Sequence, residues 1–173
     1  MKKIDLFREV LAYLAPIHGN VETELHFQTP FQLLVATVLS AQCTDKRVNM
    51  VTPALFESFP TPVEMSQATP EAIFEYIRSV SYPNAKAKHL VELAKMLVEK
   101  YQGEVPQTLE QLTQLPGVGR KTANVVLAVA FGQAALAVDT HIYRVAHRLG
   151  LVPASANTPY KVEMALRKFI PEE

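Results

Sequence analysis

The stretch LPGVGRKTA at residues 115–123 lies between two segments with helical periodicity. Pro116 ends the first helix, and Gly117 and Gly119 permit backbone angles and a close approach that a Cβ would prevent. We expect Val118 to pack between the two helices while the glycine N–H groups face outward. The unpaired N–H groups and the dipole of the second helix favour an anion. The pattern therefore predicts a helix–hairpin–helix that holds a phosphate backbone without reading bases.

The charge distribution supports this interpretation over a plain helix–helix connection, which is the alternative for an isolated G-x-G turn. The 173-residue chain carries 17 basic and 17 acidic side chains, so its net charge is zero and any nucleic-acid surface must be local. Residues 1–114 hold 10 basic and 13 acidic groups, whereas residues 115–148 hold four basic groups and one acid. The hairpin opens this basic segment.

Other features of the composition exclude several classes of protein. A single cysteine excludes an internal disulfide, a CxxC redox pair and an all-cysteine metal site within these residues. The longest uncharged run, 25–44, has an apolar part too short for a bilayer, which requires ~20 apolar residues. The charged N-terminal segment is typical of an amphipathic helix rather than a signal peptide. We therefore expect a cytoplasmic protein without membrane contact.

The chain is expected to be all-α, because no segment shows a period-two alternation bounded by turn signals. Thr-Pro pairs at Thr29, Thr61, Thr69 and Thr158 predict helix starts, whereas the pair at Thr52 predicts a kink or a break. Capping-box spacing occurs at 61–64 and 108–111. The expected helices are about 4–15, 30–41, 45–58, 62–66, 70–80, 85–101, 109–114, 120–131, 140–149 and 159–169.

Two residues of the basic segment are candidates for chemistry. Lys121 falls in the first turn of a helix, where the dipole and Arg120 favour the neutral, nucleophilic amine. A solvated lysine that touches a phosphate is the simpler alternative. Asp139 precedes a helix, where an N-cap aspartate is common. It is also the only acid among the four cations of residues 115–148, which is more than a cap requires.

The stretch at residues 115–151 closely resembles the helix–hairpin–helix and the aspartate-ending loop of the DNA glycosylase superfamily, and within it the endonuclease III family of base-excision repair enzymes. The string LSAQCTD at 39–45 resembles that family's LSAQxTD motif. The strings NAKA at 84–87 and GEVP at 103–106 are also similar. The resemblance runs from about residue 5 to 170.

This resemblance implies a fold and a reaction. Residues 22–135 would form a six-helix lobe with the hairpin, and residues 1–21 and 136–173 a second lobe, with DNA in a cleft between them. Lys121 would be the catalytic lysine that displaces a flipped oxidised pyrimidine, forms a Schiff base and nicks the strand by β-elimination. Asp139 would be the catalytic aspartate that steadies positive charge and assists proton transfers.

The resemblance also implies further site residues. Gln42 would fill the space left by the flipped base, although an exposed helix-end glutamine is the simpler alternative. Tyr82 stands where the family usually has a wedge such as leucine after a glycine, and could instead be a half-buried loop aromatic. The residues expected to contact DNA are Gln42, Tyr82, Leu115, Pro116, Gly117, Val118, Gly119, Arg120 and Thr122. The residues expected to support the catalytic pair are Ser40, Asp45, His141 and Arg144.

The sequence differs from the family in one feature. Most family members have four further cysteines that bind a 4Fe–4S cluster. This sequence has only Cys43, which we interpret as a small core thiol, and it ends at Glu173. A cluster-free variant and a truncated chain both fit. His141 and His147 are six apart and do not share a helix face, so we expect no metal site and no cofactor.

Three other functions remain as alternatives. Adenine-removing relatives normally lack a lysine at the position of Lys121, whereas oxoguanine glycosylases share the lysine–aspartate pair. A non-catalytic or impaired helix–hairpin–helix DNA-binding protein is the third. The preferred interpretation is a bifunctional DNA glycosylase/AP lyase that acts as a monomer on damaged or abasic double-stranded DNA at the bacterial nucleoid.

Overall fold

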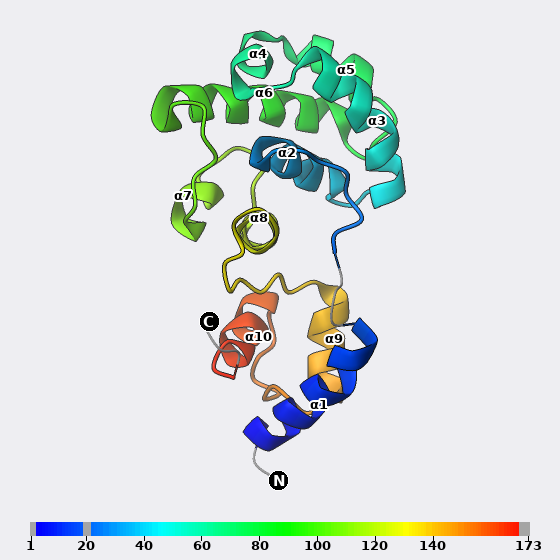
Figure 1. The fold of residues 1–173 in the computed structure, drawn as a ribbon, viewed down its shortest axis with the longest axis vertical. Helices are drawn as coiled ribbons and strands as arrows, with labels where there is room; N and C mark the ends of the chain where they lie inside the picture. The colour runs from blue at the N-terminus through cyan, green and yellow to red at the C-terminus, as the bar shows by residue number, and fades with distance from the viewer. Residues whose placement is uncertain (1–2, 19–21, 170–173) are drawn as a thin grey trace. The chain divides into compact units, whose positions relative to one another are not determined.

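A computed structural model describes residues 3–18 and 22–169. These residues form helices and no strand, which confirms the all-α prediction (Figure 1). The helices are α1 (Lys3–His18), α2 (Pro30–Ser40), α3 (Asp45–Ser58), α4 (Pro62–Gln67), α5 (Pro70–Ile77), α6 (Pro83–Tyr101), α7 (Leu109–Thr113), α8 (Arg120–Phe131), α9 (Thr140–Arg148) and α10 (Pro159–Leu166).

The chain divides into two compact units. The hairpin unit is Thr23–Gln133, and the terminal unit combines Met1–Glu22 with Ala134–Glu173. The hairpin unit, described throughout, contains seven helices, α2 to α8. The helices predicted from the sequence for this part of the chain, 62–66 and 109–114 included, correspond one to one to α2–α8, whereas the resemblance implies a lobe of six.

The core of the hairpin unit is built around α2, where nine consecutive residues, 31–39, are buried. A helix that is apolar on all sides must be surrounded by other elements. In the hairpin unit α6 and α8 lie on different sides of α2 (Figure 1). The apolar stripe of α6 completes this core with Leu90, Leu93 and Leu97, each fully buried. Burial of each such side chain stabilises the unit by about 1.5–3 kcal/mol. Because α2 is the helix that these side chains surround, it is held firmly, and the turn that follows it is held at its first residue.

Threonine caps define most helix starts, as the Thr-Pro pairs predict. Thr29, Thr61, Thr69 and Thr158 are the N-caps of α2, α4, α5 and α10, and each side chain accepts a bond from a backbone N–H of the first turn. Glu64 completes the predicted capping box of α4. The side-chain hydrogen bond from Thr61 is the main cause that lowers the pKa of the Glu64 carboxyl.

Two local predictions differ from the structure. Pro53 lies inside α3, which continues from Asp45 to Ser58 without the predicted break. The fully buried neighbours Val48 and Leu55 hold the helix on both sides of the missing N–H. At the start of α7, Gln111 accepts from the Thr108 hydroxyl (3.0 Å), whereas a capping box would have it accept from the backbone.

The terminal unit joins the two ends of the chain through one apolar core. Phe7 on α1 packs against Phe169, with their ring centroids 5.7 Å apart. The remaining buried members of this core come from the segment that contains α9 and α10: Val138, Ala146, Leu151, Val152, Ala156, Val162 and Leu166. Asp139 therefore begins α9 next to a buried anchor, Val138.

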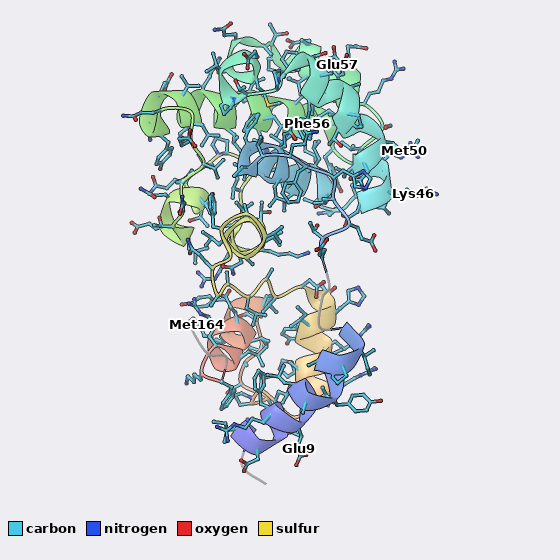
Figure 2. The ribbon with its side chains drawn as sticks, in the orientation of Figure 1. Glu9, Lys46, Met50, Phe56, Glu57 and Met164 are labelled. Carbon is cyan, nitrogen blue, oxygen red and sulfur yellow. The ribbon has the colours of Figure 1, made fainter. Side chains whose placement is uncertain are left out.

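Some helices carry apolar side chains on their outer surfaces. Met50 on α3 and Met164 on α10 project from their helices, 63% and 42% exposed (Figure 2). Within the described residues, no helix has the length and hydropathy that crossing a bilayer requires.

Candidate functional site

The turn between α7 and α8 is tight, and its first and last residues are buried. The N–H of Val118 donates to the carbonyl of Leu115 at 3.1 Å. Pro116 and Gly117 occupy the two central positions, and the glycine has φ +77°, as a type II turn requires. Leu115 and Val118 are 2% and 7% exposed. The burial of Val118 agrees with its expected packing, and Gly117, between the two buried residues, is exposed.

The two hairpin glycines have different structural roles. Gly117 needs its missing Cβ for two reasons, since φ is positive and a Cβ would lie 3.0 Å from the Cβ of His89. Gly119 has φ −88°, which any residue adopts, and a Cβ there would meet nothing within 4 Å. The predicted special backbone angle therefore applies to Gly117 alone, and Gly119 only keeps space open on the outer side.

The first turn of α8 presents its N–H groups without a capping side chain. Gly119 is the N-cap, and it has no side chain to accept a bond. Among α2 to α10, whose N-caps are all described, only α6 and α8 lack a side-chain cap. Lys121 is exposed in this uncapped turn, with the half-buried Arg120 and Thr122 on either side. An uncapped N-terminus with adjacent cations is suited to a phosphate.

Asp139 is the N-cap of α9 in the terminal unit. Its Oδ1 accepts a hydrogen bond from the N–H of Ile142 at 2.8 Å, and the side chain is half-buried. The cap fixes the rotamer of the carboxylate and leaves Oδ2 outside the capping bond. Thus the cap and the expected catalytic role are compatible, because they use different oxygen atoms.

The residues expected to support Asp139 form a local pair on α9. His141 and Arg144 are both exposed, and the His141 Nδ1 lies 3.4 Å from a guanidinium nitrogen of Arg144. His147 instead donates from Nδ1 to the carbonyl of Tyr143 at 2.8 Å, with the two rings 4.5 Å apart. The two histidines thus have separate partners on the same helix.

Gln42 lies in a strained turn directly after α2. The N–H of Cys43 donates to the carbonyl of Ser40 at 3.0 Å. Ala41 has φ −58° and ψ 115°, and Gln42 has φ +54°. This is a type II turn with glutamine at the position that favours glycine. The Gln42 side chain is exposed, so the turn presents it to the outside.

Ser40 and Asp45, expected to support the catalytic pair, have local structural roles. The Ser40 hydroxyl donates to the carbonyl of Thr37 at 2.9 Å. Asp45 is the first residue of α3, where a carboxylate favours the helix dipole, and Thr44 is the N-cap. Both residues flank the turn that carries Gln42. The structure therefore places them near Gln42 in the hairpin unit, while Asp139 belongs to the terminal unit.

Tyr82 occupies a second strained turn, which is joined to the Gln42 turn by a hydrogen bond. It has φ +54°, is the N-cap of α6 and is 66% exposed, more than the half-buried alternative implied. The hydroxyl of its neighbour Ser81 donates to the carbonyl of Gln42 at 2.6 Å. The structure thus brings together two residues, Gln42 and Tyr82, that are expected to contact DNA.

Lys86 is a buried cation that the sequence analysis did not single out. It is 6% exposed, and Nζ donates to the carbonyls of Leu39 at 2.8 Å and Ala41 at 2.7 Å. Burial lowers the pKa of its ammonium, and the neighbouring Cys43 thiol acts in the opposite direction. Cys43 itself is half-buried rather than part of the core.

A weak sequence signal could have indicated Lys86, but none indicates His89 or Ser81, which the sequence prediction also missed. Lys86 lies within the NAKA string of the family resemblance, at a helix position whose neighbours Ala87 and Leu90 are apolar. A lysine among buried apolar positions suggests that its ammonium has a hydrogen-bond acceptor, but the sequence does not identify that acceptor. The contacts of Ser81 and His89 join residues far apart in the chain and have no local pattern.

The described residues do not form a metal centre. No group of three or more His, Cys, Asp or Glu side chains among them could hold a metal ion. A 4Fe–4S cluster takes four thiolates, and the sequence supplies one cysteine. The residues present therefore do not fit the cluster.

Comparison with known proteins gives consistent matches. Residues 35–172 match the HhH-GPD family, described as "HhH-GPD superfamily base excision DNA repair protein". The chain is 48% identical over 165 residues to an endonuclease III from Synechocystis sp., covering 95% of this chain and 74% of that protein. It is 42% identical over 165 residues to an endonuclease III from Escherichia coli strain K12, covering 95% and 77%.

Solved structures agree with the sequence matches. The fold superposes with a TM-score of 0.93 and 45% identity on a structure described as a trapped endonuclease III–DNA covalent intermediate, covering all of this chain and 81% of that one. A non-covalent endonuclease III–DNA complex gives 0.92 and 44%, covering 100% and 80%. The expected helix–hairpin–helix glycosylase fold is confirmed.

Proposed function

The chain belongs to the endonuclease III family of the HhH-GPD superfamily, and on this premise we propose that Lys121 and Asp139 perform its chemistry. The family gives the reaction class, which is that of a base-excision repair DNA glycosylase with AP lyase activity. The proposal adds the residues, the substrate and the steps. Its substrate is double-stranded DNA with an oxidised pyrimidine or an abasic site, and its acting form is a monomer at the bacterial nucleoid.

One observation carries the assignment of Lys121. Its exposed side chain comes from the uncapped first turn of α8, directly after the hairpin glycines. The turn that offers N–H groups to a phosphate therefore also supplies the amine. Since a sugar carbon lies within a few bonds of each phosphate, binding of the backbone delivers Lys121 to its target by proximity.

The reaction begins when the damaged base leaves the stack, which costs a few kcal/mol and less for a weakly paired lesion. Neutral Lys121 Nζ attacks C1′, and the bond from C1′ to the base breaks with its electron pair leaving on the base, which takes up a proton. A proton then moves from the nitrogen to O4′ as the C1′–O4′ bond breaks with its electron pair on O4′, and the nitrogen lone pair forms the C=N bond of the Schiff base. Removal of a C2′ proton then expels the 3′ phosphate by β-elimination, and water releases Lys121.

Asp139 supports these steps as a carboxylate. Its Oδ1 is held by the N–H of Ile142, so the remaining oxygen, Oδ2, has a fixed direction. A carboxylate held in this way stabilises the positive charge that develops on the sugar and assists proton transfer. His141 and Arg144, on the exposed side of the same helix, are proposed to position the DNA next to it.

Borohydride trapping tests the proposal. Incubation of the protein with an abasic duplex and borohydride should give a covalent adduct, and Lys121→Gln should abolish it. Lys95→Gln is the matched control, because Lys95 is also an exposed helical lysine but lies on α6. Absence of an adduct from folded, DNA-binding wild type would leave the non-catalytic DNA-binding alternative.

The lesion is tested separately from the chemistry. Duplexes with an oxidised pyrimidine, an adenine mispaired with oxoguanine, or oxoguanine should be incubated with the protein under single-turnover conditions. The oxidised pyrimidine should be removed fastest. Faster removal of either purine would contradict the proposed lesion while leaving the Schiff-base chemistry intact.

A further inference from the structure

Strained backbone marks the two turns that carry Gln42 and Tyr82. Within the described residues, the non-glycine positions with positive φ are Gln42, Tyr82 and Gln102. Gln102 is an ordinary left-handed helix end, following α6 and preceding Gly103. The other two are the residues assigned to the interior of the duplex. A left-handed backbone is unfavourable for a residue with a side chain and persists only where surrounding structure holds it.

Ser81 provides the first hold between the turns. Its hydroxyl donates to the Gln42 carbonyl at 2.6 Å, across 39 positions of the sequence. Because Ser81 directly precedes Tyr82, one hydrogen bond joins both strained residues through their backbones. In the described part of the chain, this is the only hydrogen bond from a side chain of residues 80–84 to the turn at 40–43.

Lys86 provides the second hold. Its buried Nζ donates to the carbonyls of Leu39 and Ala41, which lie at the carboxyl end of α2 where carbonyls have no partner within the helix. A cation at this end also complements the helix dipole. The backbone N–H of Lys86 donates to the carbonyl of Tyr82 at 3.1 Å. Lys86 therefore contacts the residue before Gln42 with its side chain and Tyr82 with its backbone.

We propose that Ser81 and Lys86 are positioning residues for DNA opening, which hold the turns at 40–43 and 81–83 together so that Gln42 and Tyr82 enter the duplex as one preorganised pair. The inference rests on the proposed function, a reaction that needs the DNA opened, and on the expectation from the family resemblance that these two side chains contact DNA. Fixing both turns before binding removes an ordering cost that flexible turns would pay on the DNA. The free energy saved is then available for unstacking the base pair.

The test uses DNA on which no chemistry occurs. A duplex with a tetrahydrofuran abasic analogue and 2-aminopurine opposite it reports unstacking by fluorescence, at saturating protein. Wild type should raise the fluorescence. Ser81→Ala should lower the opening equilibrium about 3- to 10-fold, as expected for the loss of one hydrogen bond, and Ser81→Thr, which keeps the hydroxyl, should restore it.

Ser66→Ala is the matched control. The Ser66 hydroxyl also donates to a backbone carbonyl, that of Val63 at 2.7 Å, but within α4. It should leave the fluorescence at the wild-type level. Circular dichroism and thermal unfolding of every variant establish that the fold is retained, and duplex binding is measured separately so that opening is compared at equal occupancy.

A double-mutant cycle separates positioning from general stability. If Ser81 acts by positioning Gln42 and Tyr82 as a pair, then Ser81→Ala should have a smaller effect on opening in a Gln42→Ala background, where the pair is already broken. A merely structural role would give the same loss in both backgrounds. Equal losses, or an unchanged opening equilibrium in Ser81→Ala, would overturn the inference.

Failure of the inference and failure of the proposed function are distinguishable. Wild type that raises the fluorescence but gives no borohydride adduct would refute the lysine chemistry and leave the positioning inference standing. Wild type that gives the adduct but no fluorescence rise would overturn the inference alone.

Discussion

Gly117 in the hairpin lies so near His89 on α6 that a Cβ added to Gly117 would be 3.0 Å from the Cβ of His89. The hairpin is therefore held in place by α6 as well as by its own two helices. Because His89 offers a Cβ rather than the flexible end of a long side chain, it has little freedom to move away. The position thus excludes every residue except glycine for a tertiary reason as well as a local one.

Gly117→Ala should lower both stability and DNA affinity. The left-handed backbone costs an alanine roughly 1–2 kcal/mol, and the clash with His89 adds about 1–3 kcal/mol. Gly103→Ala is the control, because Gly103 has a similar φ of +83° but open space around it. Urea unfolding should show the larger loss for Gly117→Ala. Binding of damaged and undamaged duplex should weaken alike, whereas a loss confined to damaged DNA would contradict a grip on the backbone.

Substitutions at Asp139 should separate its cap from its charge. Asp139→Asn keeps a good N-cap residue, so the free energy of unfolding should change little while the rate of Schiff-base formation falls. Asp139→Ala should show the same fall in the rate of Schiff-base formation and should also lower the free energy of unfolding by about 1 kcal/mol.

Thr158→Ala is the matched control for the cap, since Thr158 caps α10 in the same unit. Thr158→Ala should lower the free energy of unfolding about as much as Asp139→Ala does, and it should form the Schiff base at the wild-type rate. The measurements are thermal unfolding and single-turnover trapping on an abasic duplex. A normal trapping rate for Asp139→Asn would refute the catalytic role of the carboxylate.

Arg120→Gln should weaken duplex binding through the phosphate backbone. Neutralising one phosphate contact should reduce the slope of log affinity against log salt concentration by about 0.9. The loss should be similar for all duplex sequences, since phosphate contacts carry no base information. Titrations at several salt concentrations measure the slope. Lys95→Gln on α6 should leave it unchanged, and an unchanged slope in Arg120→Gln would place that side chain away from the DNA.

Lys86 should make stability depend on alkaline pH. Burial lowers the pKa of its ammonium below the ordinary value of 10.5, so between the folded pKa and 10.5 the unfolded chain binds more protons than the folded one. The free energy of unfolding of wild type, relative to Lys86→Met, should therefore rise with pH through this window, and it should be independent of pH below the folded pKa and above 10.5.

At neutral pH, Lys86→Met should still be the less stable protein. It leaves the carbonyls of Leu39 and Ala41 without their donor, which costs about 1–3 kcal/mol when such groups are buried. Denaturant unfolding of both proteins at a series of pH values supplies both results. Parallel stability curves across the alkaline range would contradict a depressed pKa at Lys86.

Local chemistry made much of the fold predictable from sequence. The Thr-Pro pairs mark the starts of α2, α4, α5 and α10 because a threonine cap and a proline both act within one turn. The start of α8 after Gly119 and the left-handed turn at Gly117 are also set by residues within one turn of the chain. At Pro53 only the predicted break is absent, because α3 continues through the proline from Asp45 to Ser58; the alternative prediction, a kink, stays a prediction.

For the site, the sequence by itself determined the hairpin, the uncapped turn that carries Lys121 and the cap at Asp139. Each depends on neighbours within about four residues, which the chain order specifies. Only the tertiary structure decided that the turns of Gln42 and Tyr82 are joined by Ser81 and Lys86, and that Gly117 faces His89. These contacts depend on how α2, α6 and the hairpin pack, and side-chain bonds to distant backbone groups leave no periodic pattern in the sequence.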